Sequence, residues 1–321
     1  MRGWRESRAG SAVTLALVLS LSLVVAACSD DASQDAGPSP SSAGPPTSAA
    51  TSLPPSTTAV PPTTGAPPGT TVAPPSTTVA PAPPSTTVPA RPPWLGTRPL
   101  PLRPDGIGVA QPTPPELAPR VLPTVDVLPP PPGDEFVWDA RPVPPEVAAR
   151  STWEPACPVA LDELRYVTVA FVGFDGRVHT GELLLHADAV DAVVEVFRRL
   201  HAARYPVEEM RITSREELDA PPTGDGNTTG AFVCRPAVGS TTWSQHAFGR
   251  AVDLNPFQNP YVRGDIVIPE LATAYVDREL GWPGMLVPGD VVVEAFAAVG
   301  WGWGGDYRTM KDWHHFSATG R

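Results

Sequence analysis

Two stretches of the sequence hold the residue types that most strongly indicate chemistry. The first, residues 244–256, places His246 seven positions before Asp253, and the second, near the C-terminus, places Asp312 three positions before His315. Two imidazoles and one carboxylate form a common ligand set of catalytic zinc, whose fourth position holds water. A further carboxylate within reach of that water can act as its general base. The two stretches therefore predict one Zn²⁺ bound by His246, Asp253 and His315, with Asp312 as the base.

The backbone must turn within each stretch if these side chains are to converge. Positions three or seven apart lie on opposite faces of a regular strand. Gly249 can supply a turn in the first stretch, and we expect another turn in the second. Apolar and β-branched residues predict strands over 250–255 and 312–317.

Several neighbouring side chains are candidates for supporting roles. His314 would face away from His315 on a strand, so we expect it to contact substrate or solvent, and the Asp-x-x-His spacing favours His315 as the ligand. Ser244 is expected to support the site or to be structural rather than to act as a nucleophile. Trp313 is a candidate for a substrate groove, with core packing as the alternative, and Tyr261 is a candidate for substrate contact. The other histidines are expected to pack or to face solvent: His179, His186 and His201.

The region that carries these residues contains both strand and helix patterns. Residues 165–174 are β-branched and aromatic, and Asp175-Gly176 is a preferred two-residue turn, so we expect a hairpin that returns over 178–185. Apolar residues at helical spacing predict two helices, over 188–205 and 291–299, capped by Asp188 and Asp290. This order indicates an α+β fold in which helices flank a small antiparallel sheet.

Composition divides the chain into an open part and a folded part. The chain has 321 residues, and most of its 44 prolines lie before residue 150. This skew indicates one folded domain behind a long unfolded approach. The formal net charge of −11 argues against a nucleic-acid partner, because phosphate binding requires a basic surface.

The N-terminus has the pattern of an export signal. Three arginines among the first eight residues precede an apolar run over 12–27, as in a secretory signal peptide. The run ends in Val25-Ala26-Ala27-Cys28, which resembles the lipobox of bacterial lipoproteins, whose cysteine is acylated. An uncleaved membrane anchor is the alternative, although the run is short for a membrane span. We therefore expect an extracytoplasmic protein that Cys28 anchors to the cell membrane.

The segment that follows offers little to bury. Residues 29–132 are rich in Pro, Thr, Ser and Ala, and such a composition predicts a disordered linker. A linker of this length would let an anchored domain reach into a cell wall, and a spacer with no length requirement is the alternative. Residues 133–152 are transitional, and residues 153–321 are expected to form the folded domain, which we expect to be a monomer. Cys157 and Cys234 are the two cysteines left after Cys28, and in an exported protein they are predicted to form a disulfide.

The motif Ser244-x-His246-x-x-Gly249-x-Ala251-x-Asp253, together with Asp312-x-x-His315, resembles the zinc D-alanyl-D-alanine carboxypeptidases of the VanY type. It is also similar to the related L-alanyl-D-glutamate endopeptidases of the cell wall. The likeness extends from about Trp153 to Phe316 and excludes the linker and the lipobox.

The resemblance implies a role for each motif residue. It implies that His246, Asp253 and His315 bind zinc, that Asp312 is the general base, and that Arg235 stabilises the developing oxyanion. The substrate would be a peptidoglycan stem peptide. The alternative hypothesis is a binding module that keeps the fold and recognises cell-wall peptide without cleaving it, because fold alone does not decide function.

Overall fold

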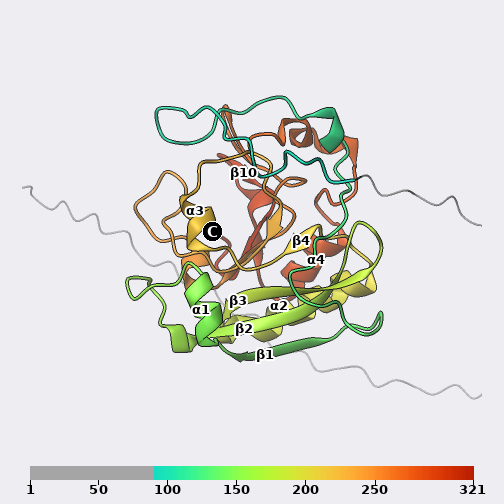
Figure 1. Cartoon of the computed structure of the whole chain (residues 1–321), viewed down its shortest axis with the longest axis vertical. Coiled ribbons are helices and arrows are strands. Elements are labelled where there is room, and N and C mark those ends of the chain that lie inside the picture. Colours follow the sequence, from blue (N-terminus) through green and yellow to red (C-terminus); the bar gives the residue numbers. More distant parts are fainter. Residues whose placement is uncertain (1–89) are drawn as a thin grey trace, which may run out of the picture. The chain divides into compact units, whose positions relative to one another are not determined.

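The computed structural model describes residues 90–321 (Figure 1). The predicted signal peptide, the lipidation site Cys28 and the predicted linker as far as residue 89 lie outside this part of the chain.

A long antiparallel hairpin forms the largest sheet. Strands β2 (Leu164–Val172) and β3 (Val178–His186) pair along their whole length, and β1 (Trp138–Pro142) pairs with the other edge of β2. The connection is one residue longer than predicted, because the Gly173 N–H donates to the Arg177 carbonyl and leaves residues 174–176 in the turn. Only Gly176 has a positive φ there, 73°, which suits a three-residue turn rather than a two-residue one.

Two helices pack against each other and against this sheet. Helix α2 (Val190–Ala202) lies against β2, and α4 (Val291–Ala298) packs on α2 (Figure 1). Asp290 caps α4 as predicted, because its Oδ1 accepts hydrogen bonds from the backbone of the helix's second and third residues. The prediction that Asp188 caps the other helix was wrong. Asp188 lies in a 3-10 turn before α2, where its carboxylate pairs with Arg250 instead.

Short strands fill the rest of the domain. One antiparallel sheet has the order β6 (Ala251–Asp253), β11 (His315–Ser317), β9 (Gly302–Trp303), and another has the order β10 (Lys311–Asp312), β7 (Tyr261–Arg263), β8 (Ile266–Ile268). The two short strands β4 (Glu209–Met210) and β5 (Thr228–Thr229) pair in parallel, and the short helices are α1 (Pro145–Arg150) and α3 (Arg215–Asp219). The predicted α+β fold with small antiparallel sheets is confirmed.

The last part of the predicted linker, residues 90–132, lies within the described part of the chain and packs on the domain. Residues 90–132 run across the domain, and the buried side chains of Leu117 and Leu122 join a core cluster with Tyr275. Arg120 is only 2% exposed and donates from Nε and Nη2 to the two carboxylate oxygens of buried Glu208, each at 2.7 Å. A few anchoring residues therefore order a segment whose average composition is that of a linker. The transitional residues 133–152 likewise contain β1 and α1.

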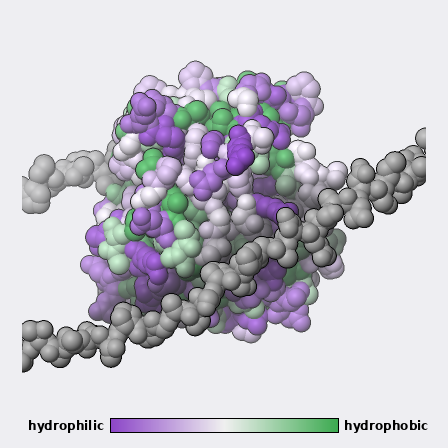
Figure 2. Space-filling view, turned by 180° about the vertical axis from the view of Figure 1, so that it is seen from behind, coloured by the Kyte–Doolittle hydropathy of each residue, from purple (hydrophilic) through white to green (hydrophobic). Residues whose placement is uncertain are grey.

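The predicted disulfide between Cys157 and Cys234 is present, with the two Cα atoms 5.8 Å apart. Among residues 90–321 no helix combines the length and the apolar character that crossing a bilayer requires. On the face shown in Figure 2, apolar residues are scattered in small groups among polar ones.

Candidate metal centre

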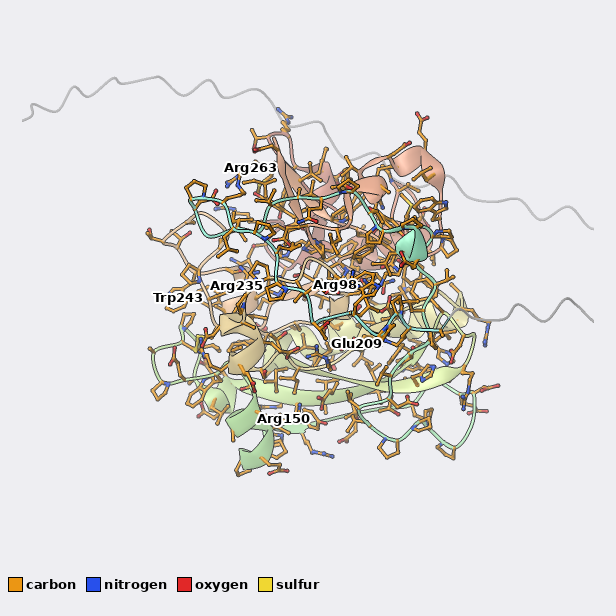
Figure 3. All side chains as sticks on the ribbon, turned by 45° about the horizontal axis from the view of Figure 1, so that its top comes forward. Arg98, Arg150, Glu209, Arg235, Trp243 and Arg263 are labelled. Atoms are coloured by element: carbon orange, nitrogen blue, oxygen red, sulfur yellow. A yellow bond between two sulfur atoms is a disulfide. The ribbon has the colours of Figure 1, made fainter. Side chains whose placement is uncertain are left out.

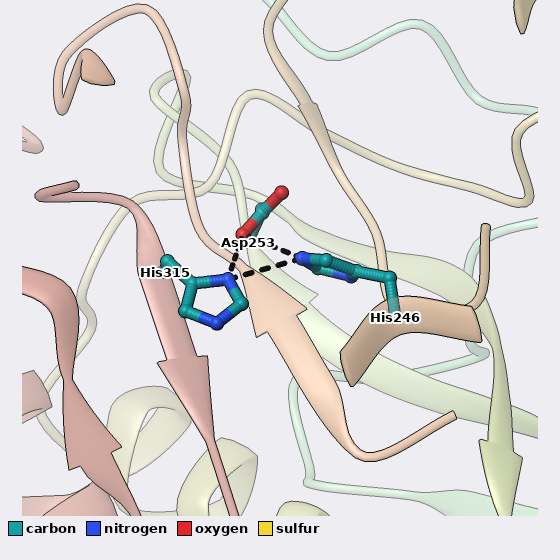
Figure 4. Close-up of side chains that lie close together, drawn as sticks. All are labelled: His246, Asp253 and His315. Carbon is teal, nitrogen blue, oxygen red and sulfur yellow. Dashed lines mark hydrogen bonds and ion pairs between the residues drawn. The ribbon is translucent and has the colours of Figure 1, made fainter. Parts of the chain in front are cut away.

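Three side chains from two distant stretches of the sequence meet at one point (Figure 4). His246 Nε2, His315 Nδ1 and Asp253 Oδ1 lie 3.1 Å from one another in all three pairs. The sequence-predicted ligands are thus brought together with one donor atom each.

Local structure explains how the first stretch turns. His246 lies in a 3-10 helix, Gln245–Phe248, which Ser244 caps by accepting a hydrogen bond from the His246 N–H at 3.3 Å. Gly249 ends this helix with a φ of 66°, a left-handed conformation that favours glycine. The chain then enters β6, whose last residue, Asp253, is the direct cross-strand partner of His315 on β11.

The second nitrogen of each imidazole is held by a backbone carbonyl. His246 Nδ1 lies 2.5 Å from the Ala231 carbonyl oxygen, and His315 Nε2 lies 3.1 Å from that of Arg321. A backbone oxygen only accepts, so in the neutral imidazole each of these nitrogens carries the proton and the other nitrogen presents a lone pair. The two lone pairs and the Asp253 carboxylate therefore face one another, an arrangement that a cation stabilises.

The spacing and charge of the donors fit zinc. Tetrahedral zinc with bonds of about 2.0–2.1 Å to N and O holds its ligand atoms roughly 3.3–3.4 Å apart, close to the separations found here. Burial opposes the charge of Asp253, but His246 and His314 lower the pKa of this carboxyl well below its usual range. A deprotonated carboxylate with two imidazole lone pairs is the form of this ligand set that binds metal.

The second stretch turns at Trp313 and His314, between β10 and β11. His314 does not face solvent: it is 8% exposed, and its Nδ1–H donates to the Asn259 carbonyl at 2.7 Å. Its Nε2 lies 3.0 Å from Asp312 Oδ1 and 3.8 Å from Asp253 Oδ2. Burial alone would lower the pKa of His314, but these two carboxylates raise it to about 9. His314 therefore connects the predicted base to a predicted ligand.

Asp312 Oδ1 is buried and has no partner of good hydrogen-bond geometry among the described side chains, since the His314 contact is close but poorly aligned. Asp312 also lines a cavity of about 630 Å³, together with the three residues that supply the donors. The predicted base is therefore placed in the same cavity as the metal site.

The same cavity collects most of the other predicted site residues. Arg235, Ser244, Tyr261 and His314 line it. Trp313 is not among the lining residues; it packs against the core, and the Arg278 guanidinium carbon lies 4.8 Å from the centre of its ring. Core packing, the alternative considered for Trp313, is the arrangement found.

The cavity residues that were not predicted from the sequence include Trp243, Arg263 and Arg321. A signal existed for Arg263, because it follows Tyr261 by two positions in β7 and so shares its face of the strand. Trp243 comes directly before the motif, and its position depends on a loop that no local pattern specifies.

Comparison with known proteins supports the chemistry of this site. Residues 238–318 match the family model described as D-alanyl-D-alanine carboxypeptidase. The match includes His246, Asp253, Asp312 and His315, and it begins after Arg235. No curated protein and no solved structure matches the chain. The region that builds the candidate metal centre is therefore similar to a family of peptidases, which supports a hydrolase.

Proposed function

We propose that this protein is a zinc-dependent metallopeptidase that hydrolyses stem peptides of peptidoglycan. The single observation that carries the proposal is the convergence of His246, Asp253 and His315, whose donor atoms face one another beside Asp312. The match to the D-alanyl-D-alanine carboxypeptidase family supports the substrate class.

Each residue of the cavity has a separate task in this mechanism. Zinc, when bound by His246, Asp253 and His315, supplies Lewis acidity and a water of lowered pKa. Asp312 accepts the proton of the attacking water and returns it to the leaving amine. His314, held by the Asn259 carbonyl, keeps its Nε2 3.0 Å from the Asp312 carboxylate. Arg235 supplies positive charge for the oxygen of the carbonyl under attack.

In this proposal the N-terminal part of the chain brings the domain to its substrate. Acylation of Cys28 would anchor the protein to the cell membrane, and the Pro/Thr-rich segment would let the domain reach into the cell wall as a monomer. Removal of a terminal D-Ala and cleavage after L-Ala use the same groups, so both belong to the proposed activity.

The test is digestion of purified peptidoglycan by the chain from residue 29 onward, with released fragments identified by mass spectrometry. Asp312→Asn and a chelator-treated sample are the controls. Loss of terminal D-Ala, or cleavage between L-Ala and D-Glu, should occur with the zinc-loaded protein and vanish in both controls. Stoichiometric zinc without any cleavage would overturn the enzymatic proposal and favour a binding module for cell-wall peptide.

A further inference from the structure

Three arginines line the cavity beside the metal site in a protein that is acidic overall. Apart from the ligands, Asp312 and His314, its charged lining residues are Arg235, Arg263 and Arg321, whereas the chain has a net charge of −11. Within the described part of the chain, the Arg235 side chain donates only to the Pro236 carbonyl, and no carboxylate pairs with Arg263. Unpaired guanidinium groups in a cavity are suited to bind carboxylates, often through two parallel hydrogen bonds.

Strand β7 fixes where Arg263 stands relative to the predicted base. Tyr261 is the cross-strand partner of Asp312, and Arg263 lies two positions further along β7 on the same face. Two residues of a strand advance by about 7 Å, the length of roughly two residues of an extended peptide. A peptide held against Asp312 would therefore bring a flanking residue to Arg263.

The guanidinium of Arg263 reaches across to the opposite wall of the cavity. That wall is the hairpin loop 236–243, closed by the bridge between Pro236 and Trp243. A Cβ added at Gly239, at the tip of the loop, would lie only 3.1 Å from Arg263 Nη2. Figure 3 shows Arg235, Trp243 and Arg263 on the same side of the molecule, in keeping with their shared cavity.

We propose that Arg263 is a specificity-determining residue that binds a carboxylate of the substrate flanking the scissile bond. This inference rests on the proposed function and names its substrate class: an acidic peptide with a free carboxylate near the bond that is cleaved. Arg235, on the other side of the loop, remains available to the carbonyl under attack. The cavity would then stabilise two negative charges of the substrate, the carboxylate at Arg263 and the developing oxyanion at Arg235.

The experiment measures binding of a stem pentapeptide, L-Ala-γ-D-Glu-L-Lys-D-Ala-D-Ala, and of two analogues amidated at the D-Glu carboxylate or at the C-terminus. Calorimetry with zinc-loaded Asp312→Asn protein keeps the peptides intact. Arg263→Gln in the same background is compared with Arg308→Gln, which removes an exposed arginine outside the cavity wall and changes the net charge equally.

Amidation of one of the two carboxylates should weaken binding roughly five- to tenfold in the parent, as expected for one guanidinium–carboxylate pair in a half-open cavity. The Arg263→Gln protein should bind the free peptide more weakly by the same factor, and that amidation should no longer change its affinity. The Arg308→Gln protein should keep the parent's ratio of affinities for the free and the amidated peptide. Equal loss for all three peptides in Arg263→Gln would show that Arg263 only supports the loop and would overturn the inference. So would a parent protein indifferent to both amidations.

Cleavage by the protein with Asp312 intact is measured separately on the same free peptide. Amide-sensitive binding without cleavage would refute the proposed hydrolysis and leave the role of Arg263 standing. Cleavage by a protein whose binding does not respond to amidation would support the proposed hydrolysis and refute the role of Arg263.

Discussion

Within residues 90–321, two of the places where histidine meets aspartate differ in where the imidazole nitrogens point. In the metal centre, His246 and His315 each use one nitrogen on a backbone carbonyl and direct the other toward Asp253. In the second cluster, which we call the His179 clamp, both nitrogens of buried His179 meet carboxylates. Nδ1 lies 2.8 Å from Asp126 Oδ1, and Nε2 lies 3.0 Å from Asp175 Oδ1.

This difference shows what separates a metal ligand from a structural histidine. A ligand needs a free lone pair that faces other donors, and a carbonyl on its second nitrogen provides this. His179 has no such nitrogen, because a carboxylate occupies each of them. The His179 clamp instead ties residue 126 of the ordered N-terminal segment to the turn between β2 and β3. The two clusters contain the same residue types, and the direction of the imidazole lone pairs decides whether a histidine can bind metal or only supports the structure.

Removing one metal ligand should have the largest effect on zinc binding and on hydrolysis. His246→Ala leaves two donors, so we expect zinc affinity to fall more than about 100-fold and hydrolysis to disappear. This loss exceeds the one typical of changing a residue that only hydrogen-bonds to a ligand. His179→Ala should bind zinc as the parent does. Metal content after dialysis against a zinc buffer measures both, and zinc loss in His179→Ala would contradict the contrast between the clusters.

The predicted base should separate chemistry from metal binding. Asp312→Asn keeps the shape of the side chain but cannot accept the proton, so hydrolysis should fall roughly 10²- to 10⁴-fold while zinc stays stoichiometric. The steady-state rate on a stem pentapeptide and the metal content of the same sample are compared. An active Asp312→Asn protein would assign the base to another group.

The ordered N-terminal segment should matter for stability rather than for chemistry. Arg120→Ala leaves the Glu208 carboxylate, 0% exposed, without its main partner, so the free energy of unfolding should fall by about 3–5 kcal/mol. Urea unfolding measures this change. Arg98→Ala, an exposed arginine of the same segment, is the control and should cost less than about 1 kcal/mol. An equal, small loss in both would show that residues 90–132 are not part of the cooperative fold.

Much of the fold followed from local patterns. The hairpin of β2 and β3, helix α2 and the Asp290 cap all have signals within a few residues. The start of α2 could not be predicted from a local signal, since Asp188 pairs with Arg250, more than 60 residues later, and does not cap the helix. The order of residues 90–132 also depends on distant partners, because the buried side chain of Arg120 donates to Glu208 and to the Asp225 carbonyl.

The site shows the same division between local and distant causes. The need for turns at Gly249 and before His315 follows from the spacing of the residues on a strand. The inward position of His314 and the packing of Trp313 depend on Asn259 and Arg278, which no local pattern connects to them. The place of Arg263 opposite Gly239 likewise depends on the tertiary fold.

Acid should weaken the His179 clamp by a small, measurable amount. Burial would raise the pKa of Asp175, but hydrogen bonds from His179 and the Arg177 N–H lower it below its usual value of 3.8. Since the folded pKa is the lower one, Asp175 stabilises the fold above that usual value, and this stabilisation is lost as the pH falls through the folded pKa. Because Asp175 is partly solvated, the loss should be less than about 1 kcal/mol.

The measurement is the free energy of unfolding from about pH 6 to about pH 3 for the parent, Asp175→Asn and Asp306→Asn. Asp306 is an exposed carboxylate and serves as the matched control. Asp175→Asn should be less stable near neutral pH and should lose less stability in acid, so its curve approaches that of the parent. Parallel curves for the parent and Asp175→Asn would mean that His179 binds Asp175 without an electrostatic contribution, which would reduce the clamp to packing.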